Sequence, residues 1–150
     1  MYDNQENEQQ FWPASVVTNF DPSKMTLEMF EKSPIWLKPL KWNQGGYDAV
    51  YVDIKKNLVR FVQITRWTEH SFKIEYFANF FENLRKIKDS KIEIKTLEIY
   101  FLVPKKNVNK FKIKDSEITG KGLLVVFGKG WEKNKEHDQV KVRGIQGFGQ

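Results

Sequence analysis

The residues of this chain whose types and spacing could carry chemistry lie within positions 42–84. Asp48 follows a Gly-Gly-Tyr turn, and Gln63 stands fifteen residues later, near the end of the next predicted strand. His70 and Lys73 open the segment after it. Carboxylate and amide oxygens suit a hard cation such as Mg²⁺, and a lysine close by can stabilise negative charge. The pattern indicates a metal-dependent site at the ends of paired strands.

The same side chains also have plain structural explanations. Asp48 can be an exposed residue beside a turn, although Asp is depleted in strands. Gln63 and Thr65 can be ordinary solvent-facing strand positions. His70 and Lys73 can be surface residues near a helix start. Trp67, directly after a strand, is expected either to pack against the strand end or to lie against a ligand.

A hairpin is predicted to position the first two site residues. Residues 47–54 and 58–65 alternate and are rich in Val, Tyr and Phe, which is typical of strands. Lys55-Lys56-Asn57 connects them, and Asn57 can adopt a left-handed conformation. Alternation places Gln63 on the same face as Phe61.

A helix over 70–88 is predicted from an apolar stripe at helical spacing, with Thr68 as a possible N-cap. We expect this stripe, and Phe111 further on, to be core. Another helix is predicted over 21–31, begun by Asp21-Pro22 and ended by Pro34. Pro39 suggests that strand 35–40 is an edge strand. The further predicted strands are 96–103, 111–114, 122–127 and 139–142.

The composition indicates one globular α/β domain. The chain has 150 residues, with 25 Lys and Arg against 19 Asp and Glu, and no Cys. Length alone favours a single domain, and the basic excess fits either an anionic partner or a solvated lysine-rich surface. Residues 1–20 are expected to be a flexible lead-in, 21–143 the domain and 144–150 a flexible tail. No secretory signal is expected at positions 1–10, and the longest apolar run, 123–127, is too short to cross a membrane.

The predicted order of elements, αβββαβ with extra strands after it, is the common core of restriction-endonuclease-like nucleases of the PD-(D/E)xK superfamily. The run Trp-Asn-Gln-Gly-Gly-Tyr-Asp-Ala-Val at 42–50, the strand 58–66, and His70-x-x-Lys73 resemble the nuclease-like domain of trypanosome retrotransposon hot spot proteins. More distantly, they resemble the C-terminal domain of Crinkler effectors. In that family a P-loop ATPase domain usually precedes this one. The sequence has no Gly-x-x-x-x-Gly-Lys-Ser/Thr motif, so we expect the ATPase part to be absent.

The resemblance implies roles for particular residues. Asp48 would be the metal-ligating carboxylate, Gln63 would replace the second acid, and the backbone carbonyl of Ile64 would be a further ligand for Mg²⁺ (or Mn²⁺). Lys73 would supply the amine of the usual strand lysine, whose position Thr65 occupies, with His70 orienting Lys73 or a water.

The resemblance leaves the extra carboxylate open between Glu28 and Glu31. Replacing an acid by an amide removes a negative charge, so metal affinity is expected to be lower.

The function implied is metal-dependent cleavage of phosphodiester bonds in DNA (or RNA), in an intracellular, nuclear setting. The alternative is an inactive nuclease-derived module that binds nucleic acid or a nuclear protein partner. No membrane partner is expected. The lysine-rich segments 85–95 and 105–114 could contact phosphates.

Overall fold

A mixed seven-stranded sheet is the centre of the computed structural model, which describes residues 3–5, 16–40, 47–87, 92–119 and 140–145. The strand order within those residues is β1-β9-β7-β5-β4-β3-β2. The strands are β1 (Asp3–Gln5), β2 (Val16–Phe20), β3 (Ile35–Pro39), β4 (Ala49–Asp53), β5 (Leu58–Ile64), β7 (Thr96–Pro104) and β9 (Val140–Ile145). Strands β3, β4 and β5 form an antiparallel meander, whereas β7 pairs parallel with both β5 and β9.

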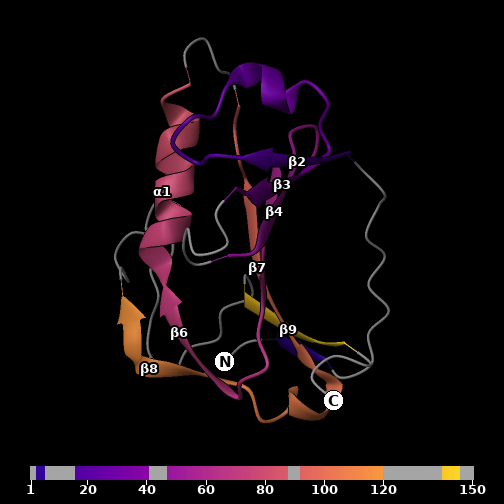
Figure 1. Cartoon of the computed structure of the whole chain (residues 1–150), viewed down its shortest axis with the longest axis vertical. Coiled ribbons are helices and arrows are strands. Elements are labelled where there is room, and N and C mark those ends of the chain that lie inside the picture. Colours follow the sequence, from indigo (N-terminus) through magenta and orange to yellow (C-terminus); the bar gives the residue numbers. More distant parts are fainter. Residues whose placement is uncertain (1–2, 6–15, 41–46, 88–91, 120–139, 146–150) are drawn as a thin grey trace.

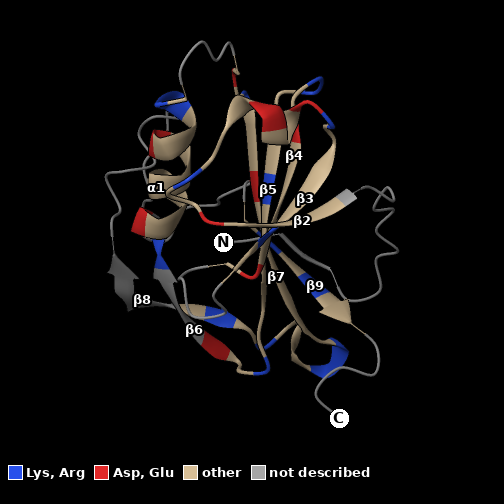
Figure 2. Cartoon of the chain, turned by 45° about the horizontal axis from the view of Figure 1, so that its top comes forward, with Lys and Arg blue, Asp and Glu red and all other residues tan. Residues whose placement is uncertain are grey.

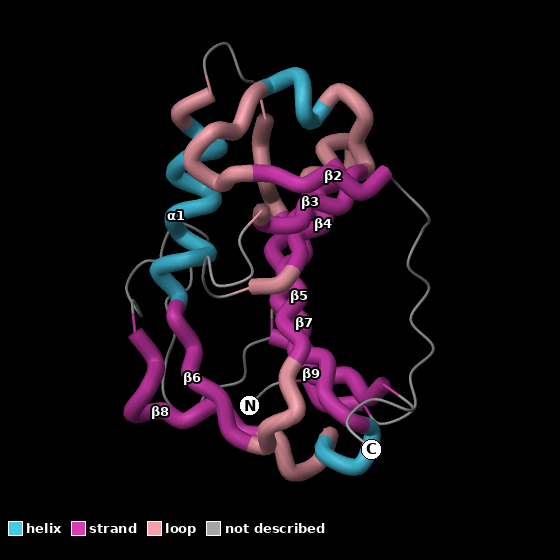
Figure 3. Tube along the Cα trace, in the orientation of Figure 1, coloured by secondary structure: helices cyan, strands magenta, loops and turns pink. Residues whose placement is uncertain are grey.

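A second layer lies beside one face of this sheet (Figure 1). It consists of helix α1 (Ile74–Arg85) and a two-stranded parallel sheet of β6 (Glu69–Lys73) and β8 (Lys112–Thr119). Two short 3-10 helices, η1 (Leu27–Phe30) and η2 (Lys105–Asn107), lie at opposite ends of the molecule (Figure 3). The central strands and α1 therefore define two layers with one core between them.

Aromatic side chains of α1 fill that core. Phe77, Phe80 and Phe81 are buried, and their ring centroids lie 4.7, 5.3 and 5.7 Å from that of Phe61 on β5. Edge-to-face contacts of this kind add to the stabilisation from apolar burial. The expectation that the helical stripe is core is confirmed for Phe77, Phe80, Phe81 and Leu84, whereas Tyr76 and Ile87 are only partly buried. The expectation for Phe111, which packs on Phe101, is also confirmed.

The β4–β5 hairpin forms as expected. Its strands are one to two residues shorter at some ends than predicted, and Asn57 adopts the left-handed region with φ 53°. The Asp53 side chain accepts a hydrogen bond from the Lys56 backbone N–H at 3.2 Å, which holds the turn. Local turn chemistry was enough to predict this unit.

The helix predicted over 70–88 begins later than expected, at Ile74. Residues 69–73 are strand β6 instead, and Glu69 and His70 pair with Lys112 and Ile113 of β8. Thr68 is not the N-cap, because Lys73 occupies that position and makes no side-chain capping bond. A ladder to a strand about 40 residues away overrode local helix propensity here.

The helix predicted over 21–31 is also wrong over most of its length. Only Leu27–Phe30 is helical, as one 3-10 turn. The Asp21 carboxylate accepts from the backbone and hydroxyl of Ser23 at 2.9 and 2.7 Å, and the Lys24 N–H bonds to the Asp21 carbonyl. Asp21 therefore closes a turn instead of capping a helix.

Several strand predictions change in position or length. Strand β3 is not at the edge, because β2 pairs with it on its outer side. The predicted lead-in 1–20 contains β1 and β2, which form the two edges of the sheet, and β9 extends to Ile145, beyond the expected domain end. Strand β8 is longer than predicted. The strand predicted over 122–127 lies outside the described residues.

The expected fold class, α/β with a central mixed sheet, is confirmed. The meander, the crossover through α1 and the parallel strand β7 occur in the predicted order, with η1 where the first helix was expected. In the part of the chain that the structure describes, no helix has both the length and the apolar character of a membrane span.

Candidate functional site

The Asp48 carboxylate lies at the end of strand β5. Asp48 directly precedes β4, is exposed, and donates its backbone N–H to the Val62 carbonyl at 2.8 Å. Its Oδ2 accepts a hydrogen bond from the Ile64 backbone N–H at 2.7 Å. The side chain thus takes the place of a strand carbonyl and satisfies the last N–H of β5 on this side. Within the described residues, Oδ1 receives no hydrogen bond.

Gln63 is the neighbour of Asp48 across the strand pair. Ala49 pairs with Val62, so the next residues outward on the two chains are Asp48 and Gln63. Gln63 is half-buried and, by strand alternation, shares the face of Phe61 that α1 covers. The sequence alone could predict that Asp48 and Gln63 are adjacent, because their adjacency follows from the register of the β4–β5 hairpin.

The Ile64 backbone carbonyl is a further oxygen atom at this end of β5. A residue in an antiparallel ladder directs its N–H and its C=O to the same neighbouring strand. The Ile64 N–H meets Asp48, so its carbonyl is directed to the same side. One carboxylate and two neutral oxygens fit the hard-ligand chemistry of Mg²⁺ or Mn²⁺, with few negative charges for such a site.

Lys73 and His70 lie on a different element from the one expected. Both belong to β6, and Lys73 stands where β6 passes into α1, on the side of the sheet that α1 covers (Figure 3). The Lys73 side chain is exposed, with Nζ 5.9 Å from the centre of the Tyr76 ring. The Lys73 amine is therefore attached to the second layer and not to β5, the strand that carries Gln63.

Glu28 and Glu31 are not brought to Asp48. Ser33, two residues after Glu31, donates to the Val52 carbonyl and accepts from the Ile54 N–H at the far end of β4. Asp48 precedes the opposite end of that strand. Both glutamates are exposed, as expected for surface charges, so neither supplies the extra carboxylate.

The segment after β5 presents an exposed tryptophan. The Thr65 side chain is buried and its hydroxyl accepts from the Trp67 backbone N–H at 3.2 Å. The Trp67 residue itself is 74% exposed, so it does not pack against the strand end. Buried Asn107 donates to the Arg66 carbonyl at 3.1 Å and holds this segment to η2. No local sequence pattern indicated this role for Asn107.

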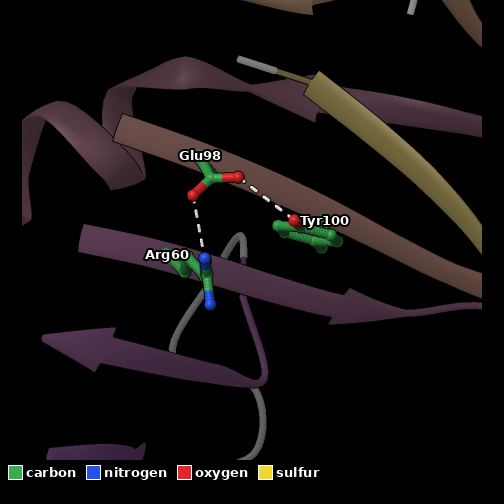
Figure 4. A network of polar contacts seen from close by, with 3 residues as sticks. All are labelled: Arg60, Glu98 and Tyr100. Atoms are coloured by element: carbon green, nitrogen blue, oxygen red, sulfur yellow. Dashed lines mark hydrogen bonds and ion pairs between the residues drawn. The ribbon is translucent and has the colours of Figure 1, made fainter. Parts of the chain in front are cut away.

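A polar cluster on the other face of the sheet was also missed by the sequence analysis (Figure 4). Arg60 Nε donates to Glu98 Oε1 at 3.0 Å, and the Tyr100 hydroxyl donates to Glu98 Oε2 at 3.1 Å. The buried Arg143 guanidinium lies 5.6 Å from the Tyr100 ring centre. The spacing of Glu98 and Tyr100, two apart in a strand, was the available signal.

Burial raises the pKa of three tyrosines, Tyr47, Tyr51 and Tyr100. For Tyr100, desolvation followed by the charge of Glu98 raises the pKa to about 12, against a partly compensating effect of Arg60. Desolvation also raises the pKa of Tyr47, which packs on Phe61 with 4.9 Å between ring centres. The Tyr100 hydroxyl donates to Glu98, whereas the Tyr47 ring packs in the aromatic core.

Two findings bear on the class of site. Among the described residues, no cluster of three or more His, Asp or Glu side chains could hold a metal ion. Comparison of the chain with family models, with curated proteins and with solved structures gave no match. The resemblance to retrotransposon hot spot and Crinkler domains therefore stays an expectation carried by its sequence motifs.

Proposed function

We propose that this chain is a metal-dependent nuclease domain that cleaves phosphodiester bonds in DNA or RNA. The proposal depends on one observation: the Asp48 carboxylate is held at the end of β5 by the Ile64 N–H, next to Gln63. A strand end with an exposed carboxylate is where the restriction-endonuclease-like arrangement would hold its cation.

The roles of the residues follow from their positions. Asp48 Oδ1, the Gln63 side-chain oxygen and the Ile64 carbonyl would hold Mg²⁺ or Mn²⁺. When bound, such an ion stabilises charge on the phosphate and lowers the pKa of the attacking water. Lys73 lies at the junction of β6 and α1, and its side chain is exposed to solvent. Its amine would stabilise negative charge on the substrate. His70 would orient Lys73 or a water.

A second candidate function is nucleic-acid binding without cleavage. It is favoured by the donor set, in which Gln63 is neutral and Thr65, at the usual lysine position, is buried and bonded to the Trp67 backbone. The site then retains one carboxylate. In this alternative, the domain would bind nucleic acid, or a nuclear protein partner, and leave it intact. We propose a nuclear location for the protein under either candidate function.

Plasmid nicking separates the two functions. The purified chain is incubated with supercoiled plasmid and Mg²⁺ or Mn²⁺, beside Asp48→Asn, which keeps an acceptor for the Ile64 N–H. Nicking by the native chain that is lost in Asp48→Asn and in EDTA supports the nuclease. Nicking that persists in Asp48→Asn contradicts the assigned site. Plasmid that is bound but stays supercoiled supports the second candidate.

A further inference from the structure

The loop from Thr65 to Glu69 and the segment around η2 form one surface at the end of the sheet. The Asn107 side chain donates to the Arg66 carbonyl at 3.1 Å, and the Lys112 N–H donates to the Thr68 carbonyl at 2.7 Å. The two segments are therefore held together by one side-chain and one backbone hydrogen bond. We call the exposed residues of these segments the Trp67 surface, namely Arg66, Trp67, Thr68, Glu69, Lys105, Lys106, Asn109, Lys110 and Lys112.

The Trp67 surface is strongly basic. Segments 65–69 and 104–113 contain five Lys and Arg residues and one acidic residue, Glu69, and all six are exposed. Figure 2 shows the basic colour on η2 and on the neighbouring strands at this end, with one acidic stretch on β6. A local excess of this size attracts phosphate groups and gives binding that weakens with salt.

Trp67 is the feature that separates this surface from a merely solvated lysine-rich face. Tryptophan is highly buried on average, yet Trp67 is 74% exposed, and Ile64, three residues before it, is 47% exposed. The Trp67 backbone is fixed by its N–H bond to Thr65 and by the bonds that hold Arg66 and Thr68. A rigidly mounted, exposed indole loses little backbone freedom when a ligand stacks on it.

We propose that the Trp67 surface binds single-stranded nucleic acid, with an unpaired base stacked on the Trp67 indole and phosphates on the surrounding lysines. An indole stacks on the flat face of a base and does not form hydrogen bonds that read the base edges. The stacking is therefore tolerant of nucleotide sequence. Bases in a duplex are already stacked on each other, so duplex DNA cannot offer this contact. The inference takes the nucleic-acid substrate of the proposed function as its starting point and specifies its strand state.

The binding test uses a labelled oligo(dT) in EDTA, so that cleavage plays no part, with fluorescence anisotropy at physiological salt. Trp67→Ala is expected to weaken binding about five- to 150-fold, which is about 1–3 kcal/mol of stacking. Trp67→Phe should retain most of the affinity. Far-UV circular dichroism verifies that each variant is folded.

Charge reversal gives a matched pair. Lys105→Glu with Lys106→Glu should weaken binding and reduce the slope of log affinity against log salt by about 0.7 for each phosphate that the variant no longer neutralises. Lys55→Glu with Lys56→Glu, equally exposed in the turn before β5, is the control and should leave binding unchanged at physiological salt, where charges are screened beyond about 8 Å.

Any of three results with nucleic acid would overturn the inference, and so would one result with vesicles. They are unchanged affinity in Trp67→Ala, an equal loss in the Lys55 and Lys56 control, or duplex DNA bound as tightly as oligo(dT). Binding to phosphatidylserine vesicles without binding to oligo(dT) would also overturn it, and would assign the surface to an anionic membrane.

The experiments distinguish failure of the nuclease proposal from failure of the Trp67 surface proposal. If the native chain and Asp48→Asn both bind oligo(dT) normally, while the native chain with Mg²⁺ or Mn²⁺ neither nicks plasmid nor cuts single-stranded DNA, the Trp67 surface stands and cleavage does not. If Trp67→Ala cleaves single-stranded substrate with unchanged kcat/KM, cleavage stands and the Trp67 surface does not.

Discussion

Arg60 and Glu98 form an ion pair between two parallel strands, with 3.0 Å between Nε and Oε1. Arg60 lies on β5 and Glu98 is its direct partner on β7. The two side chains are 19% and 15% exposed, and Glu98 also accepts from Tyr100. The pair therefore connects the two strands at the centre of the sheet on the face opposite α1.

Glu98→Gln is expected to lower the free energy of unfolding by about 1–3 kcal/mol, because a charge-assisted bond to Arg60 is lost in a largely buried setting. Urea unfolding followed by circular dichroism measures the change. Glu82→Gln, on the exposed side of α1, is the control and should change stability by less than about 0.5 kcal/mol. Equal stability of Glu98→Gln and the native chain would show that the pair is energetically neutral.

Tyr100 should make the protein sensitive to alkali. Burial and the nearby Glu98 raise the pKa of this phenol from 10.0 to about 12, so the folded chain holds the proton more tightly than the unfolded chain. The resulting stability is complete below about pH 10 and is lost as pH rises through about 12. Tyr100→Phe should show a smaller fall in urea midpoint across that range than the native chain. Identical falls would contradict the raised pKa.

The Asp48 side chain should contribute to stability independently of any metal. Asp48→Ala removes the acceptor of the Ile64 N–H, so unfolding free energy is expected to fall by about 0.5–1.5 kcal/mol in EDTA. Asp48→Asn keeps an acceptor oxygen and should lose less. The comparison is made by urea unfolding, and a larger loss in Asp48→Asn than in Asp48→Ala would contradict the hydrogen bond.

Phe61 should be among the most sensitive core positions. Its ring meets Tyr47 and three phenylalanines of α1, and it is fully buried. Phe61→Ala is expected to cost about 3–5 kcal/mol, whereas Phe61→Leu, which leaves a smaller cavity, should cost less. Thermal unfolding ranks the two variants. A Phe61→Ala protein as stable as Phe61→Leu would mean that α1 collapses onto the sheet.

Local sequence signals predicted the hairpin that holds Asp48 and Gln63. Alternation and the turn at Asn57 set the register, and register makes these two residues neighbours. The apolar stripe likewise predicted which side chains of α1 are buried, because helical periodicity depends on residues three and four apart. These features depend on nearby residues, so a single sequence contains them.

The tertiary structure alone decided where His70, Lys73 and Trp67 lie. Residues 69–73 pair with β8, and the loop before them is held by Asn107, so both depend on residues about 40 positions away. The cluster of Arg60, Glu98 and Tyr100 likewise exists only because β7 pairs parallel with β5 after the α1 crossover. Such contacts are set by burial and backbone pairing over long sequence separations, which local propensity does not contain.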